Sequence, residues 1–164
     1  MDNPFWQFSL RIYKNERVKN YCLEFQEQEA INVNLLLFCC WLAYAVEPIS
    51  KAEFIKACQS IATWQKEVTE SLRRARRYLK TFPAHSWPRD FYLLILENEI
   101  KSESYQQEQL YLHFADKQRK PSFCDHELMQ SYLFWLFEEG EIVVSPELSS
   151  RIQDFKCLIL SLLV

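Results

Sequence analysis

Residues 34–46 read "NLLLFCCWLAYAV", and this stretch decides the fold. From Leu35 to Val46 it holds twelve residues without a charged or strongly polar side chain. A helix of this length rises only about 18 Å, whereas a membrane-spanning helix needs about 20 apolar residues. A helix that is apolar on every side belongs in the middle of a helical protein. We therefore expect a buried central helix over about 32–46, with Asn32 as its cap.

The composition favours an all-α protein. The chain has 164 residues, of which 49% are hydrophobic, 25% are charged and 15% are aromatic, so it can bury a sizeable core. Its single glycine is Gly140. Phosphate-binding loops and hairpin-rich sheets both need several glycines. We expect a single all-α domain over 1–164, an irregular bundle of about six to eight helices around the central one.

The remaining apolar patterns place helices on both sides of the central one. They are expected at 4–13, 16–27, 51–80, 88–115, 126–138 and 146–164. Thirty residues of helix would be about 45 Å long, more than the diameter of about 40 Å expected for a domain of this size. The stretch 51–80 is therefore expected to break or kink near 60–63.

The short connector "TFPAHSWP" predicts that the two long stretches pack antiparallel as a helical hairpin. The second stretch has a polar middle, "KSESYQQEQ", at 101–109. A polar segment of this kind is expected to leave the body of the protein or to face water. Ser104 and Gln107 have the spacing of a capping box, so a break at this point is also possible.

The six cysteines do not form a recognisable metal site. Cys39 and Cys40 are neighbours, and neighbouring helical side chains point about 100° apart, so they cannot face one ion together. Cys124, His126 and His113 follow no known ligand spacing. We expect no metal and no cofactor, and no cysteine has the surroundings of a nucleophile with its base.

Charge and the first residues bear on partners and location. The net charge of −3 argues against nucleic acid as the partner. The first residues, "MDNPFWQF", show no basic region ahead of the apolar side chains, as a signal peptide would. We expect a cytoplasmic protein with reduced thiols and no membrane span.

The run "LRRARRYLK" at 72–80 is the strongest candidate for a binding site. Arg73 and Arg77 lie on one helix face, and arginine side chains match phosphate and carboxylate groups in geometry. In the simpler interpretation these arginines form a solvated face and pair along their own helix with Glu67 and Glu70.

Asn34 is the second candidate, because a buried amide needs hydrogen-bond partners. It either ties the central helix to the preceding loop or points into a pocket. Such a pocket would lie among Trp6, Asn34, Trp64 and the arginines, with Arg76 or Arg77 converging on Asn34. It would suit an anionic or isoprenoid-like ligand.

The N-terminal half resembles a known family. The resemblance rests on "FWQFSLRIY", "CLEFQE", "INVNLLLFCCWLA" and "LRRARRYLK", and covers mainly residues 5–80. The family is an uncharacterised proteobacterial one of similar length, classed only as a domain of unknown function, with a core motif of the "VNLLLFCCWLA" type. It usually has Gly where this chain has Ala30 and Asp where it has Asn32. The resemblance implies a bacterial cytoplasmic protein and carries over no activity.

Two functions remain open on these grounds. The first is a non-enzymatic protein-interaction or regulatory module, because the chain has no metal set, nucleophile or phosphate loop. The apolar end of its C-terminal helix, Leu158 to Val164, would either dock on the core or supply the contact with a protein partner or a second copy. The alternative is a helical bundle that binds a small molecule between its helices and is possibly an enzyme.

Overall fold

The described residues form an all-α structure, as predicted. The computed structural model describes residues 2–121 and 123–163. Its helices are α1 (Pro4–Tyr13), α2 (Glu16–Glu29), α3 (Val33–Ala45), α4 (Lys51–Trp64), α5 (Glu70–Leu79), α6 (Trp87–Leu112), α7 (His126–Glu139) and α8 (Pro146–Leu162). A π-helical turn, Gln65–Thr69, joins α4 to α5, and a short 3₁₀ turn, Ala115–Lys117, follows α6.

Short polar side chains fix where these helices begin. The Asn3 side chain accepts a hydrogen bond from the Trp6 N–H at 2.9 Å, and Asn32 accepts one from the Asn34 N–H at 2.9 Å. Ser50 and Glu53 form the capping box that their spacing predicts. Such caps satisfy backbone N–H groups that have no partner within the helix. The helix starts are therefore local properties of the sequence.

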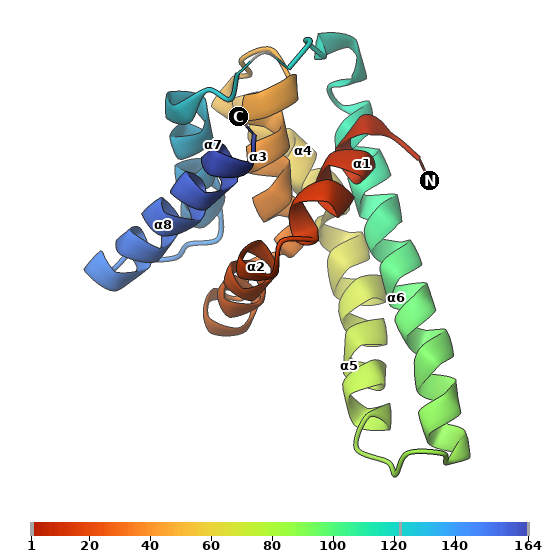
Figure 1. Cartoon of the computed structure of the whole chain (residues 1–164). Helices are drawn as coiled ribbons and strands as arrows, with labels where there is room; N and C mark the ends of the chain where they lie inside the picture. The colour runs from red at the N-terminus through yellow and green to blue at the C-terminus, as the bar shows by residue number, and fades with distance from the viewer. Residues whose placement is uncertain (1, 122, 164) are drawn as a thin grey trace.

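Helix α3 is the centre of the core, as its apolar run predicts. It lies in the middle of the molecule, with the other helices around it (Figure 1). Phe38 is fully buried and its ring lies within 5.5–6.4 Å of the rings of four aromatic residues, Phe5, Trp41, Phe54 and Phe114. Its neighbours Cys39 and Cys40 are also fully buried. No helix of the described residues has the length and apolar character that crossing a membrane requires.

The long stretch after α3 does not break where the sequence predicted. The chain runs through α4, the π-helical turn and α5, and the Glu70 N–H bonds to the Gln65 carbonyl, five residues back. Such a turn inserts one residue without ending the helix, so the irregularity lies at 65–69 and not near 60–63. Helix α6 is continuous, without the second break that the capping spacing of Ser104 and Gln107 had allowed.

Helices α5 and α6 form the predicted antiparallel hairpin. The connector joins them at the end farthest from the other helices, and this end projects from the body of the molecule (Figure 1). The excess length of the 51–80 stretch is thus accommodated outside the domain body, not by a break inside it.

The polar middle of α6 is buried, which corrects the prediction that "KSESYQQEQ" leaves the body or faces water. Its buried residues are Ser102, Ser104, Gln106 and Gln107. They lie where α6 packs against α5, α4, α1 and α3. Their side-chain amides and hydroxyls bond to groups on those helices or on α6 itself, so burial leaves most of them satisfied.

The C-terminal helix packs onto the core. Leu158, Ile159 and Leu160 are buried, and the ring of Phe155 meets that of Phe25 edge-on at 5.7 Å. Of the two possibilities for the apolar C-terminal residues, a place on the core and a place in an exposed contact surface, the first holds for these three, because α8 packs against α2 and α7. Val164, the last residue of that predicted surface, lies outside the described residues.

The left-handed backbone conformation of Ala30, at the C-terminal end of α2, can be tested by mutation. Ala30 has a φ of 56°, in the left-handed region where a Cβ is unfavourable. Ala30→Gly is therefore expected to raise the free energy of unfolding by about 1 kcal/mol, measured by chemical denaturation. Ala75→Gly, in the exposed interior of α5, should lower it by about 1 kcal/mol. A destabilising Ala30→Gly would contradict the left-handed conformation.

Candidate functional site

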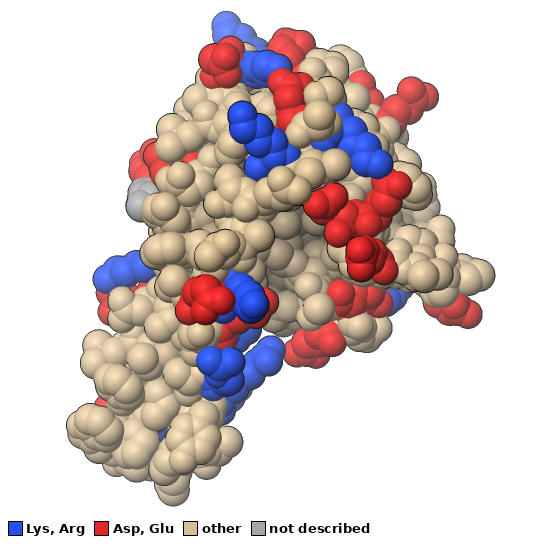
Figure 2. Space-filling model, turned by 180° about the vertical axis from the view of Figure 1, so that it is seen from behind, with Lys and Arg blue, Asp and Glu red and all other residues tan. Residues whose placement is uncertain are grey.

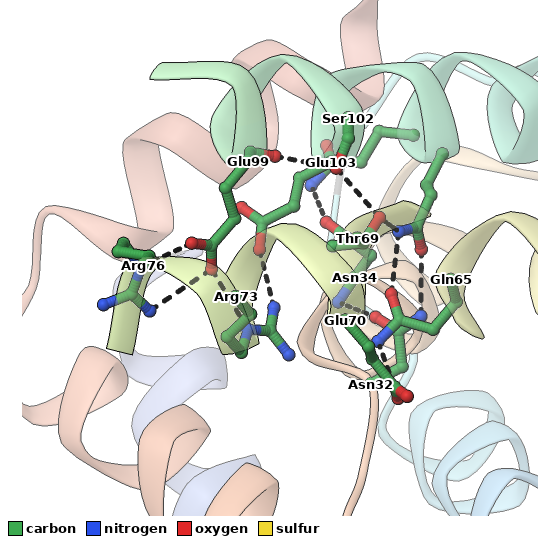
Figure 3. Close-up of polar contacts among 12 residues, drawn as sticks. Asn32, Asn34, Gln65, Thr69, Glu70, Arg73, Arg76, Glu99, Ser102 and Glu103 are labelled. Atoms are coloured by element: carbon green, nitrogen blue, oxygen red, sulfur yellow. Dashed lines mark hydrogen bonds and ion pairs between the residues drawn. The ribbon is translucent and has the colours of Figure 1, made fainter. Parts of the chain in front are cut away.

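The α5–α6 hairpin carries a buried row of charged and polar side chains between its two helices, here called the polar seam. At its outer end are Arg73, Arg76, Glu99 and Glu103 (Figure 3). Arg73 donates from Nε to Glu99 Oε1 at 3.1 Å and from Nη2 to Glu103 Oε1 at 2.9 Å. Arg76 also donates to Glu99. Glu99 is only 5% exposed, so one buried carboxylate holds two arginines.

The electrostatics of this cluster follow from burial and pairing. The hydrogen bond to Glu99 raises the pKa of Arg76 above its ordinary value. Burial raises the pKa of Glu103, and the nearby Arg73 opposes that shift. Both arginines neutralise α6 carboxylates, which leaves them poorly placed to hold an external anion.

The polar seam continues inward through neutral groups. Thr69 and Ser102 share a hydrogen bond between hydroxyls at 2.8 Å. Gln106 donates from Nε2 to Thr69 Oγ1 and to Gln65 Oε1, both at 2.7 Å, and accepts from Asn32 Nδ2 at 2.9 Å. The π-helical turn supplies Gln65 and Thr69 to this part of the seam. It therefore connects the hairpin to the cap of the central helix.

The predicted site residues fall into two groups. Four of them, Asn34, Trp64, Arg73 and Arg76, contact α6: Asn34 accepts from Gln107 Nε2 at 2.8 Å, and the Trp64 indole donates to the Ser102 carbonyl at 3.1 Å. The simpler interpretation paired the arginines with glutamates of their own helix, such as Glu70. Arg73 instead pairs with two glutamates of α6.

Arg77, the fifth predicted residue, is exposed and points elsewhere. It lines a surface hollow of about 340 Å³ together with Arg73 and Arg74, opposite Ala30 and Ile31. Asn34 does not line this hollow, and neither Arg76 nor Arg77 lines the cavity beside Asn34. The arrangement that an anion site required, with Arg76 or Arg77 converging on Asn34, is not found.

The outer half of the hairpin exposes large apolar side chains. Tyr78 is 66% exposed, Trp87 73% and Leu94 54%. The rings of Trp87 and Phe91 stack with centroids 5.4 Å apart and planes 6° apart. Seen from behind, this projecting end is mostly uncharged (Figure 2). We call the exposed side chains Tyr78, Trp87, Phe91, Leu93 and Leu94 the hairpin patch.

Comparison with known proteins adds a family but no activity. The family model described as "Protein of unknown function (DUF2390)" matches residues 4–110. The chain belongs to the DUF2390 family. The resemblance seen in residues 5–80 is thus confirmed, and the match extends it almost to the end of α6. No curated protein and no solved structure matches the chain.

The DUF2390 match includes α5, the connector and all of α6 except its last two residues, while α7 and α8 lie beyond it. The polar seam and the hairpin patch are therefore features of the part that defines family membership.

Four of the six cysteine thiols in this member of DUF2390 are held protonated by burial. Burial raises the pKa of Cys22 and Cys58 to about 12, and it raises the pKa of Cys39 and Cys40 well above the ordinary value. Thiols of this kind are not nucleophilic. Within residues 2–121 and 123–163, no three His, Cys, Asp or Glu side chains are grouped so as to hold a metal ion.

The sequence reasoning missed the α6 half of the polar seam. Glu99, Ser102, Glu103 and Gln106 recur at i, i+3, i+4 and i+7, which places them on one helix face. Thr69, the last residue of the π-helical turn, and Arg73 and Arg76 of α5 recur with the same period. Two matching polar stripes on helices joined by a short connector are the signal that could have predicted the seam.

Proposed function

We propose that this protein is a non-enzymatic interaction module of the cytoplasm, and that it assembles with a second copy through the α5–α6 hairpin. The observation that carries the proposal is the hairpin patch, a group of large apolar side chains exposed at the projecting end of two rigid helices. Soluble monomers rarely expose contiguous apolar patches of more than a few hundred Å². The six free cysteines, five of them buried, suit a reducing compartment.

The exposed apolar area suits a contact with a protein partner. The exposed fractions of the patch side chains, three aromatic rings among them, range from 38% to 73%. Trp87, Phe91 and Leu94 recur at i, i+4 and i+7 on one face of α6, and these three expose roughly 400 Å². A stable interface buries about 800 Å² on each partner, so this face would supply about half of it and the neighbouring side chains of the hairpin the rest. Two hairpins packed face to face would also make a four-helix bundle, an arrangement that buries such faces efficiently.

The charges along the hairpin favour a second copy over an unrelated partner. On the outer half, α5 exposes the cations Arg77 and Lys80, and α6 exposes the carboxylate of Asp90. Glu97 is also exposed but pairs with Lys101 of its own helix. A two-fold axis parallel to the hairpin places α5 of one copy against α6 of the other. Unlike charges then meet at both edges of the interface, and a symmetric contact is self-complementary.

The dimer is tested by measuring molar mass with light scattering after size exclusion, at micromolar protein concentration. We expect the unchanged chain to be a dimer and the double variant Trp87→Ser/Leu94→Glu to be a monomer, because a charge in a buried apolar contact is unfavourable. Both positions are exposed, so the helical circular dichroism should not change.

Phe134→Ser is the matched control. Phe134 is a large apolar side chain on α7, 58% exposed and outside the hairpin patch. This variant should remain a dimer. A monomeric unchanged chain, or a double variant that stays dimeric, would overturn the proposal.

A further inference from the structure

A cavity of about 260 Å³ lies between α1, α3 and the inner half of α6. Its apolar wall consists of Trp6, Leu10, Val33, Leu37 and Ile100. Leu10 and Ile100 are both partly exposed at its rim, so the cavity can be reached from solvent. The volume is slightly below the range of about 300–1,000 Å³ of drug-sized sites. It would hold a molecule of on the order of ten non-hydrogen atoms.

Two buried polar atoms without partners belong to residues that line this cavity. Ser9 is 4% exposed and its Oγ has no hydrogen bond, and Gln107 is 3% exposed and its Oε1 has none. The amide nitrogen of Gln107 is already bonded to Asn34 Oδ1 at 2.8 Å. This bond fixes the orientation of the amide and leaves its oxygen as a free acceptor. Buried polar groups in folded proteins are normally paired, so these two atoms point to a missing partner.

The charges around the cavity indicate what that partner is. Its wall contains one carboxyl group, Glu103, and no Lys or Arg side chain. The phenol of Tyr13 also lines it, and burial raises the pKa of that phenol to about 12, so it stays neutral. An anion would enter a wall that offers an acceptor oxygen and a carboxyl group already paired with Arg73, and no Lys or Arg side chain lines that wall. The cavity therefore disfavours the anionic ligand considered from the sequence and favours a neutral or cationic one.

We propose that this cavity binds a compact molecule with an aromatic ring and an N–H donor, an arylmethylamine or an aromatic amide, which donates a hydrogen bond to Gln107 Oε1 and lies within reach of Ser9 Oγ. The apolar body of the ligand lies against Leu37 and Ile100. The site is separate from the hairpin patch, and its occupancy does not depend on whether the chain is a dimer.

The test uses the full chain and four probes of matched size, benzylamine, benzamide, benzoate and toluene, with binding followed by ligand-observed NMR at millimolar concentration. We expect benzylamine and benzamide to bind and benzoate not to bind. Toluene should bind about threefold to tenfold more weakly than benzamide, because it fills the apolar part but donates no hydrogen bond. Absence of binding by both donor probes, or equal binding of benzoate and benzamide, would overturn the proposal.

Two variants locate the site. Ser9→Ala should weaken benzamide binding by about threefold to tenfold, and Ser9→Leu should abolish it by filling the cavity. Ser104→Ala is the control, since Ser104 is also a buried helical serine, but its hydroxyl bonds to the Lys101 carbonyl and it does not line the cavity. Retention of the helical circular dichroism shows that each variant is folded. Unchanged binding by folded Ser9→Leu would place the probes elsewhere and contradict the assignment.

Discussion

Replacing Glu99 by alanine is expected to lower the free energy of unfolding by about 3 kcal/mol. The carboxylate of Glu99 is 5% exposed and pairs with both Arg73 and Arg76. Its removal leaves Arg76 without its carboxylate partner and Arg73 with Glu103 alone. Cations left in a mostly buried position lose both solvent and counter-charge, which is why deleting one member of a buried ion pair is strongly destabilising.

Glu97→Ala is the matched control for this prediction. Glu97 lies on the same helix and also pairs with a cation, Lys101, but both side chains are well exposed. Exposed pairs contribute little to stability, so this variant should change the unfolding free energy by a small fraction of the Glu99 effect. Urea denaturation followed by circular dichroism measures both. Equal effects of the two substitutions would show that the polar seam does not stabilise the hairpin.

Phe38→Ala is expected to lower the free energy of unfolding by about 4 kcal/mol. Phe38 is fully buried on α3 and contacts aromatic rings from three other segments of the chain. The substitution removes apolar burial and leaves a cavity at a point that the surrounding helices cannot easily close.

The control for Phe38 is Phe134→Ala, which removes the same side chain from an exposed position on α7. Because a surface substitution of this kind is usually within about 0.5 kcal/mol of neutral, the two variants should differ widely in denaturation midpoint. A Phe38 variant with nearly unchanged stability would contradict the central position of α3, on which the whole fold depends.

The centre of the fold and the helix starts were predictable because their causes are local. The apolar run from Leu35 to Val46 has twelve residues, which is too short to span a membrane as a helix. A run of this kind is therefore expected to form a helix buried inside the protein. Asn32 and Ser50 cap helices through bonds to residues two or three positions away. Such signals need no knowledge of the tertiary structure.

The length argument for 51–80 identified a real conflict but assigned it the wrong outcome. A helix of that length does not fit inside the domain body, and the sequence reasoning therefore placed a break near 60–63. In the structure the helical stretch continues from α4 through the π-helical turn into α5, and α5 extends beyond the body of the domain. Whether a long helix breaks or projects depends on a second helix to pack against, and α6 provides that partner.

The burial pattern of α6 could not be read from α6 alone. Its apolar outer half is exposed and its polar inner half is buried, the reverse of the usual rule. The reversal holds because Glu99 meets Arg76 of α5 and Gln106 meets Thr69 of the π-helical turn, and such matching depends on two segments about thirty residues apart. The cavity beside Asn34 was likewise beyond prediction, since a void is set by how side chains from several helices pack.

The polar seam has a consequence for how far the hairpin reaches. Two helices that packed through leucines alone could slide past each other by one turn with little loss. Here a slip of one turn would separate Arg73 from Glu99 and Gln106 from Thr69. The polar seam thus specifies a single register between α5 and α6. This register fixes the distance between the aromatic end of the hairpin and the core.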